Sequence, residues 1–395
     1  MNKVRMGIVG IGNMGSSHSK NIAAGKIPDM TLAAVCDINP ARLEWAKKEL
    51  PEGTAKFSDA ETMMKSGLVD AVIVATPHYL HPPLVEMALA NHLHVISEKP
   101  AGVYTKQVRE MNEAAAKSDK IFAVMFNQRT NCLYRKMKEI VGSGEMGAVK
   151  RTNWIITDWY RPQCYYDSGS WRATWAGEGG GVLLNQCPHN LDLWQWICGM
   201  PQKVQAFCHN GKWHDIEVED DVTAYVEYPN GATGVFITTT ADAPGTNRFE
   251  VTLEGGKLVC ENGKLLRYQL DVNEREFCRT CKQAFGAPKA TCTEVQTDGK
   301  SEQHIGVLKA FAGAILRGEP LIASGTEGIN SLMISNAMHL SSWLGKPVTL
   351  PIDEDLFWSE LQKRIATSKR KKEVKSVVAD LRGSFHDVGK GGEKA

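Results

Sequence analysis

The chain has 395 residues, a length that suits two domains better than one. Its hydrophobic content of 43% and charged content of 23% are ordinary for a globular protein and argue against disorder over most of the chain. The formal net charge of +1 excludes a general electrostatic attraction to nucleic acid or to an anionic membrane.

The N-terminus enters a strand pattern at once and lacks the apolar core and cleavage site of a signal peptide. No apolar run approaches the roughly 20 residues that cross a bilayer. We therefore expect a cytoplasmic protein whose ten cysteines are mostly free thiols. Cys278 and Cys281 form a CxxC pair followed by Cys292, but no fourth ligand has matching spacing, so we expect loop cysteines and no metal site.

The first elements carry a glycine-rich turn. A predicted strand, Val4–Val9, leads into Gly10, Gly12 and Gly15 in a G-x-G-x-x-G pattern, and a helix is predicted from Asn13 to Ala24. Such glycines allow a tight turn and close approach of a pyrophosphate. The phosphates would lie at the helix N-terminus, where free N–H groups favour anions. The pattern predicts a dinucleotide site.

A second predicted strand ends at Asp37, 22 residues after Gly15. A carboxylate there accepts hydrogen bonds from the adenosine ribose and repels a 2′-phosphate, which favours NAD over NADP. Arg42 keeps NADP open, because an arginine near this position can accommodate the extra phosphate. Asp37 could also cap the following helix, and the two roles are compatible.

Strands and helices continue to alternate up to residue 126. Strands are predicted at 70–77, 94–100 and 121–126, with helices at 84–92 and 105–119 between them. This alternation is typical of a doubly wound parallel sheet, in which ligands bind at the carboxyl ends of the strands. The segments "ATPHYLH" and "EKP" follow two such ends.

From about Gly142 the chain becomes rich in aromatic residues with arginines between them. Flat side chains stack on pyranose rings and polar groups bind the hydroxyls, so this stretch predicts a sugar pocket, with about half of the aromatics packing the core instead. The aromatics are Trp154, Trp159, Tyr160, Tyr165, Tyr166, Trp171 and Trp175. Single-stranded nucleic acid is an alternative ligand, which the near-neutral charge and the dinucleotide signature argue against.

The rest of the chain reads as strands and then helices. Asn230-Gly231 lies between two alternating runs and predicts a hairpin. Helices are predicted at 304–318 and 325–345, and a charged helical region at 358–385. Its basic run, 368–375, is interpreted as a solvated helix face.

Glu98-Lys99-Pro100, together with the upstream glycine turn and the downstream "GGG…PHNLD", resembles the glucose–fructose oxidoreductase, inositol dehydrogenase and rhizopine-catabolism (Gfo/Idh/MocA) oxidoreductases. Further matches are "ATP…H" (75–81), "NQR" (127–129), "YPNGATGVF" and "SSWLGKPVTLP". The resemblance implies an α/β protein, with an N-terminal Rossmann domain (1–126), a C-terminal α/β domain on a large open antiparallel sheet (127–385) and a tail (386–395). It also implies a homo-oligomer formed through the open sheet.

The same resemblance implies that Lys99 and His189 are catalytic. Together with the motifs above, it yields a set of residues expected to contact the cofactor: Gly10, Gly12, Asn13, Met14, Gly15, Asp37, Thr76, Pro77, His81, Glu98, Lys99 and Asn127. The residues expected to contact the substrate are Lys99, Tyr160, Arg161, Trp171, Arg172, Asn185 and His189.

The chemistry explains why a dehydrogenase would use these two catalytic residues. A histidine titrates near neutral pH and can take the hydroxyl proton, and a lysine ammonium can donate to the reacting oxygen. Pro188 either kinks a helix or begins one; in the second case the helix dipole lowers the pKa of His189. Asn185 stands where the family usually carries Asp, which removes one charge, and Asp192 is expected to orient His189 or to lie one layer behind it.

We therefore expect NAD-dependent oxidation of a secondary hydroxyl of a sugar or glycoside, at ring carbon C3. Two alternatives remain open. One is glycoside cleavage by transient C3 oxidation, elimination, hydration and re-reduction. The other is a non-catalytic NAD-sensing protein.

Overall fold

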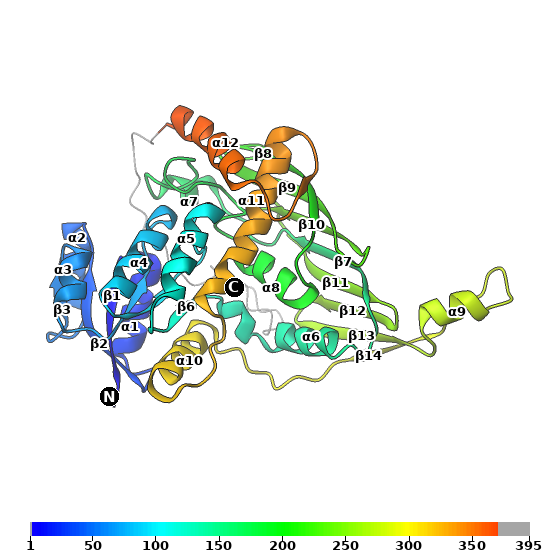
Figure 1. Ribbon diagram of the computed structural model, residues 1–395, viewed down its shortest axis with the longest axis horizontal. Coiled ribbons are helices and arrows are strands. Elements are labelled where there is room, and N and C mark those ends of the chain that lie inside the picture. The colour runs from blue at the N-terminus through cyan, green and yellow to red at the C-terminus, as the bar shows by residue number, and fades with distance from the viewer. Residues whose placement is uncertain (1, 370–395) are drawn as a thin grey trace.

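The computed structural model of the chain describes residues 2–369 and contains two β-sheets (Figure 1). Three predictions fall wholly or mostly outside the described residues. They are the part of the predicted helical region that follows residue 369, the tail 386–395 and most of the basic run 368–375. No helix among the residues described combines the length and apolar character needed to cross a membrane.

The first sheet is fully parallel, with the strand order β3-β2-β1-β4-β5-β6. Its strands are β1 (Val4–Val9), β2 (Met30–Cys36), β3 (Ala55–Phe57), β4 (Ala71–Val74), β5 (His94–Ser97) and β6 (Phe122–Val124). The helices between them are α1 (Asn13–Ala23), α2 (Pro40–Glu49), α3 (Ala60–Lys65), α4 (His81–Ala90) and α5 (Thr105–Ala116), with a 3-10 turn η1 (His78–Leu80). The predicted doubly wound sheet is confirmed, and the strand order reverses beside β1, where such folds bind ligands.

The second sheet has nine strands in the order β14-β13-β12-β11-β7-β10-β9-β8-β15. All neighbours are antiparallel except β7 and β10, so the predicted open sheet is mixed rather than purely antiparallel. Its strands are β7 (Val149–Ile156), β8 (Lys203–Asn210), β9 (Glu219–Glu227), β10 (Thr233–Thr239), β11 (Asn247–Leu253), β12 (Gly256–Glu261), β13 (Lys264–Leu270), β14 (Ala290–Glu294) and β15 (Val348–Thr349).

Within residues 2–369, helices cover one face of this sheet and leave the other bare (Figure 1). They are α6 (Cys132–Ser143), α7 (Gln163–Asp167), α8 (Pro188–Cys198), α11 (Gly328–Leu344) and α12 (Glu354–Thr367), with 3-10 turns η2 (Asn127–Thr130) and η3 (Gly325–Glu327). The covered face is packed by aromatic rings: Trp154 stacks on Phe249 with centroids 4.2 Å apart, and Trp194 stacks on Phe236. Trp194 is therefore a core residue.

One helix returns from the second half of the chain to the first sheet. α10 (Gln303–Arg317) buries Leu308 and Phe311 in the same apolar cluster as Met6 and Ile8 of β1. The division of the chain at residue 126 stays a prediction, and α10 shows that later residues complete the core of the first domain.

The predicted hairpin and the cysteine pair both lie at the periphery. Gly231 adopts φ +82° in the turn between β9 and β10, as the Asn-Gly sequence predicted. Helix α9 (Glu274–Thr280) belongs to an arm that projects beyond the sheet (Figure 1). Cys278 lies within this helix, so the prediction of a loop position is wrong for it, and Cys281 is the C-cap. All ten cysteines are free, and no cluster of three metal-ligating side chains occurs within residues 2–369.

Candidate functional site

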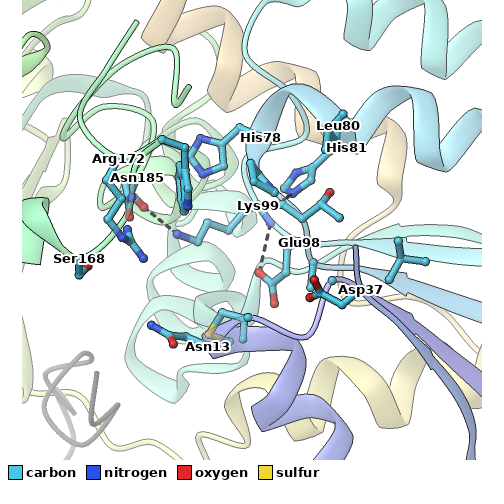
Figure 2. Close-up of a pocket in the computed structure, with 18 of the residues that line it drawn as sticks. Asn13, Asp37, His78, Leu80, His81, Glu98, Lys99, Ser168, Arg172 and Asn185 are labelled. Carbon is cyan, nitrogen blue, oxygen red and sulfur yellow. Dashed lines mark hydrogen bonds between the residues drawn. The ribbon is translucent and has the colours of Figure 1, made fainter. Parts of the chain in front are cut away.

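A cavity of about 880 Å³ lies where the carboxyl ends of the first sheet face the second domain (Figure 2). Most of the residues expected at the site line this cavity, although they are far apart in the sequence. Those that line it are Gly10, Gly12, Asn13, Met14, Asp37, Thr76, Pro77, His81, Glu98, Lys99, Tyr160, Arg161, Trp171, Arg172, Asn185 and His189. Gly15 and Asn127 do not line it.

The glycine turn has the shape that a pyrophosphate requires. Gly10 has φ +86°, and a Cβ there would lie 2.7 Å from the Ala75 carbonyl oxygen. A Cβ on Gly15 would lie 1.9 Å from the Gly10 oxygen, so this glycine lets α1 pack against the turn. A Cβ on Gly12 would meet nothing within 4 Å and would project into open space. The residues present therefore fit a dinucleotide phosphate group at the start of α1.

Asp37 follows β2 and lines the cavity. Its carboxylate accepts hydrogen bonds from the backbone N–H groups of Ile11 and Asn39, both at 2.9 Å. The cap of α2 is Asn39, so the prediction that Asp37 caps this helix is wrong. Arg42, which left NADP as a possible cofactor, is half-buried and lies outside the cavity lining.

His81 connects the loops that follow β4 and β5. Its Nδ1 lies 2.7 Å from the Pro100 oxygen and its Nε2 lies 2.7 Å from the Thr76 oxygen. Asn127 is buried behind the cavity and donates through Nδ2 to Gln303 at 2.6 Å. A direct contact of Asn127 with the cofactor stays a prediction.

Glu98 is buried and ion-paired with His18 of α1, with Oε1 and Nε2 2.6 Å apart. Burial alone would raise the pKa of Glu98, but the hydrogen bond and charge of His18, with His304 and Lys99 nearby, lower it to about 2. His304 also lines the cavity, and the sequence reading missed it. Nothing local marks this histidine, because only the return of α10 to the first sheet brings it to the site.

Lys99 reaches across from the first domain to the second. Its Nζ donates to the backbone oxygen of Asn185 at 2.7 Å, a bond drawn in Figure 2. Burial lowers the pKa of Lys99, while the carboxyl groups of Glu98 and Glu178 raise it. An ammonium has three donors, so Lys99 retains donors for a ligand in the cavity.

His189 lies in the first turn of α8. Pro188 begins the helix and Cys187 is its N-cap, so the prediction of a helix start is confirmed and the prediction of a kink is wrong. The side chain is buried, and neither ring nitrogen has a hydrogen-bond partner within the part of the chain described. Burial, followed by the charge of Lys99, holds the pKa of His189 well below its usual value. The result is a neutral imidazole with both nitrogens available.

Of the two roles expected for Asp192, a direct bond that orients His189 is not observed. Both of its oxygens bind the Arg129 guanidinium, at 2.8 Å and 2.7 Å, and Arg129 also pairs with Glu327. This buried ion pair fastens α8 to η2 and to the start of α11, so Asp192 supports the position of the helix that carries His189.

Asn185 and Glu178 form a pair that the sequence reading missed. The Asn185 side-chain amide donates to one oxygen of Glu178, and the Ala173 N–H donates to the other at 2.6 Å. Burial raises the pKa of Glu178. The expectation that Asn185 removes one charge from this region is therefore incomplete, because a buried carboxyl group lies directly behind the amide. The only local signal was a charged residue before three glycines.

The aromatic stretch divides as we expected. Four of its rings line the cavity, namely Trp159, Tyr160, Tyr165 and Trp171, while Trp154, Tyr166 and Trp175 pack elsewhere. The Arg172 guanidinium lies over both Tyr165 and Trp171, 4.6 Å and 4.7 Å from their ring centroids.

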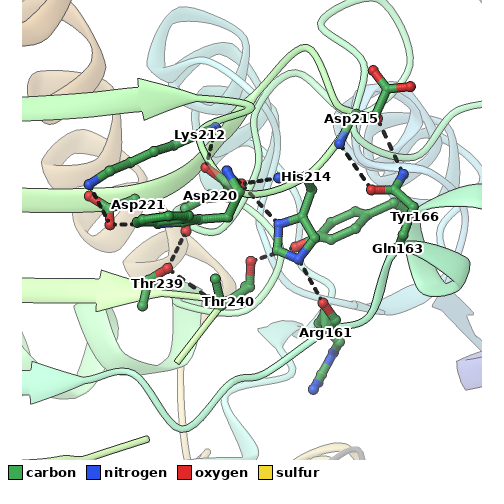
Figure 3. A network of polar contacts seen from close by, with 12 residues as sticks. Arg161, Gln163, Tyr166, Lys212, His214, Asp215, Asp220, Asp221, Thr239 and Thr240 are labelled. Carbon is green, nitrogen blue, oxygen red and sulfur yellow. Dashed lines mark hydrogen bonds and ion pairs between the residues drawn. The ribbon is translucent and has the colours of Figure 1, made fainter. Parts of the chain in front are cut away.

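The connection between β8 and β9 holds this stretch in place (Figure 3). His214 Nε2 lies 2.8 Å from the Arg161 oxygen, and its Nδ1 lies 2.9 Å from the fully buried Asp220. Gln163 and Asp215 exchange a further pair of hydrogen bonds. The wall that carries Tyr160 and Arg161 is thus fixed by contacts on the side away from the cavity.

Comparison with known proteins matches both domains. Residues 4–126 match an oxidoreductase family with an NAD-binding Rossmann fold, and residues 134–259 match the GFO/IDH/MocA C-terminal domain. A myo-inositol 2-dehydrogenase of Thermotoga maritima is 26% identical over 340 residues, which are 85% of this chain and 95% of that protein.

Two solved structures share the whole architecture. The WlbA dehydrogenase of Chromobacterium violaceum, in complex with NADH and UDP-GlcNAcA, is 28% identical with a TM-score of 0.76, covering 89% of this chain and 97% of that one. The WlbA dehydrogenase of Bordetella pertussis, with the same ligands, is 26% identical with a TM-score of 0.74, covering 89% and 100%.

The open space at Gly12 leads to a test of the cofactor site. We expect Gly12→Ala to fold normally, because the new methyl group meets no protein atom, yet to weaken NADH binding about 10- to 100-fold by blocking close approach of the phosphates. Fluorescence titration with NADH measures this. Gly142→Ala in α6, whose Cβ also meets nothing within 4 Å, is the matched control. Equal NADH affinity in the two variants would show that the turn does not hold the cofactor.

Proposed function

Because the chain belongs to the Gfo/Idh/MocA family of NAD-dependent oxidoreductases, we propose that it oxidises a secondary hydroxyl of a sugar or glycoside to a ketone, at ring carbon C3. One observation supports this proposal most strongly: His189 is neutral and buried, has no hydrogen-bond partner among the described residues, and lies on the same cavity as the Lys99 ammonium. A base and a cationic donor on one cavity are what removal of a hydroxyl proton requires.

In this proposal His189 takes the hydroxyl proton, and its lowered pKa keeps it ready to do so at neutral pH. Lys99 donates a hydrogen bond to the reacting oxygen while its bond to Asn185 holds the amine in place. The cofactor is NAD, which supplies the hydride acceptor when bound. The turn from Gly10 to Met14 would hold its phosphates, and Asp37 its adenosine ribose.

The similarity to an inositol dehydrogenase and to dehydrogenases crystallised with a UDP-sugar supports a sugar or polyol as substrate. The aromatic rings that line the cavity suit the apolar face of a pyranose. A cytoplasmic location is part of the proposal. So is the lack of nucleic-acid or membrane partners, which the near-neutral net charge supports.

Redox-neutral glycoside cleavage is the second candidate. Elimination after transient C3 oxidation needs a further acid–base group, and His304 is one that lines the cavity. Burial lowers the pKa of His304 to about 4, which leaves the imidazole neutral at working pH. A role as an NAD sensor is disfavoured, because such a role requires neither Lys99 nor an unpartnered His189.

A set of glycosides incubated in deuterated water, with and without NAD, distinguishes these functions. We expect net NADH formation, lowered about 10²- to 10⁴-fold in His189→Asn and in Lys99→Met, while both variants still bind NADH. Cleavage with deuterium at C2 and no net NADH would instead indicate oxidation and elimination. No turnover of any glycoside, with normal NADH binding, would contradict both and favour a sensor.

Glu178 should set the pH range in which Lys99 keeps its charge. Its carboxyl group raises the pKa of Lys99, so Glu178→Gln lowers that pKa further while retaining an oxygen that accepts from Ala173. Activity that needs the ammonium is lost as pH rises through the Lys99 pKa. We therefore expect the alkaline limb of the kcat/KM profile to move to lower pH.

Profiles of kcat/KM against pH, recorded beside Glu86→Gln, measure this shift. Glu86 is a half-buried carboxyl on α4 that lies outside the cavity lining, so its variant should keep the wild-type profile. If the alkaline limb does not move in Glu178→Gln, Glu178 does not affect the pKa of Lys99.

We also propose a homo-oligomer formed through the bare face of the second sheet. The strand registers place Ile155, Ile237 and Phe207 in one row across this face, and Val235 and Tyr225 in the next. Ile155, Phe207 and Tyr225 are exposed, and an apolar surface of this kind marks an interface.

Ile155→Glu should shift the protein toward the monomer, because each copy would bury a new charge in the interface. Light scattering after size-exclusion chromatography measures the mass. Leu68→Glu, an exposed leucine of the first domain, is the control and should leave the mass unchanged. Unchanged mass in both variants would locate any assembly at another surface.

A further inference from the structure

The cavity wall contributed by the second domain is positively charged. Its lining residues between 159 and 189 include Arg161 and Arg172 and contain no aspartate or glutamate. Lys99 adds its ammonium to this wall through the bond to Asn185. The two carboxylates of the lining are Asp37, which two backbone N–H groups bind beyond β2, and Glu98, which is paired with His18.

Arg172 is held in a fixed position, and most of its N–H donors have no acceptor within residues 2–369. Tyr165 and Trp171 both lie against its guanidinium, which orients the group without using its N–H edge. One N–H, from Nη1, donates to the Tyr165 hydroxyl at 2.8 Å. Within residues 2–369, Arg172 forms no ion pair. The charge of Arg172 lowers the pKa of the buried Glu178, but the two oxygens of Glu178 are bound by Asn185 and Ala173.

Figure 2 shows Arg172 beside Asn185, at the end of the Lys99 side chain and across the cavity from Asp37. Its charge therefore acts near Lys99, where the substrate reacts in the proposed function. Asp37, which is expected to bind the adenosine ribose, lies at the other end of the cavity. A sugar hydroxyl could accept one N–H bond from Arg172 but carries no charge, and Glu178, whose pKa the Arg172 charge lowers, forms no ion pair with the guanidinium. A carboxylate or phosphate compensates the charge and can accept two parallel N–H bonds from one guanidinium.

We propose that the substrate is an acidic sugar, whose carboxylate or phosphate group binds Arg172 while its reacting hydroxyl lies between Lys99 and His189. This inference rests on the proposed function and narrows its substrate class. Arg161, whose guanidinium lies 5.3 Å from the centroid of the Tyr165 ring, adds positive charge to the same wall. His214 and Gln163 form hydrogen bonds behind that wall (Figure 3).

Matched ligands test the proposal on the protein saturated with NADH. D-glucuronate and D-galacturonate represent the carboxylates, D-glucose 6-phosphate the phosphates, and D-glucose and D-galactose the neutral sugars. Isothermal titration should show at least one acidic sugar binding at least tenfold more tightly than its neutral partner. That preference should shrink between 0.05 M and 0.5 M salt, because the attraction is between charges. The preferred pair then identifies the acidic group as carboxylate or phosphate.

Variants test whether Arg172 causes the preference for acidic sugars. Arg172→Gln should reduce the ratio of acidic to neutral affinity at least tenfold, and Arg172→Lys, which keeps the charge but loses the planar fork, should retain part of it. Arg279→Gln, which removes an exposed arginine of α9 outside the cavity, makes the same change in net charge and should keep the wild-type ratio. Thermal unfolding of each variant checks that it remains folded.

The two levels of the proposal fail in different ways. Neutral sugars bound as tightly as acidic ones, no binding of any acidic sugar, or an unchanged ratio in Arg172→Gln would each overturn the acidic substrate. NADH formation from a neutral glycoside could still continue in those cases and would leave the proposed oxidation intact. Tight binding of an acidic sugar that is never oxidised would instead sustain the binding site and contradict the oxidation.

Discussion

The hydrogen bond from the Lys99 ammonium to the Asn185 carbonyl is the contact on which the site depends. The donor follows β5 in the first domain, and the acceptor lies in the turn before α8 in the second. Because this turn leads directly into α8, the same bond sets the distance between Lys99 and His189. Two residues that are 90 positions apart in the sequence therefore share one cavity, and neither domain forms the reacting end alone.

Buried charge explains much of the arrangement around that bond. Ionised groups are costly to bury unless they are paired or hydrogen-bonded, and the carboxyl groups here each have partners: Glu98 has His18, Asp192 has Arg129, and Glu178 has two N–H donors. His189 is the contrasting case, because burial and the charge of Lys99 keep it neutral. Burial and nearby charges thus place the Lys99 ammonium and a neutral imidazole on the same cavity, and removal of a proton from an alcohol needs both groups.

The features that the sequence could predict are those set by short-range chemistry. Gly10 is required by a positive φ, Asn230-Gly231 by the geometry of a tight hairpin, and Pro188 by the first turn of a helix. The partners of Asp192 and Asn185 were not predictable in this way. Arg129 lies 63 positions from Asp192, and His304 is close enough to affect the pKa of Glu98 only because α10 returns to the first sheet. Such contacts follow from the packing of whole elements, which no local pattern encodes.

Asn185 and Glu178 are best understood together. The sequence resemblance indicates that relatives usually have Asp at position 185. A carboxylate there would lie at hydrogen-bond distance from the buried Glu178, and two carboxylates at that separation cannot both ionise without a large cost. An amide at 185 avoids this conflict and donates a hydrogen bond that Glu178 accepts. The negative charge near Lys99 is therefore still present, but Glu178 carries it behind Asn185 and not at the cavity surface. This leaves the cavity surface at position 185 neutral, so that the positive charge of Lys99 and Arg172 faces the ligand without a competing carboxylate from this turn.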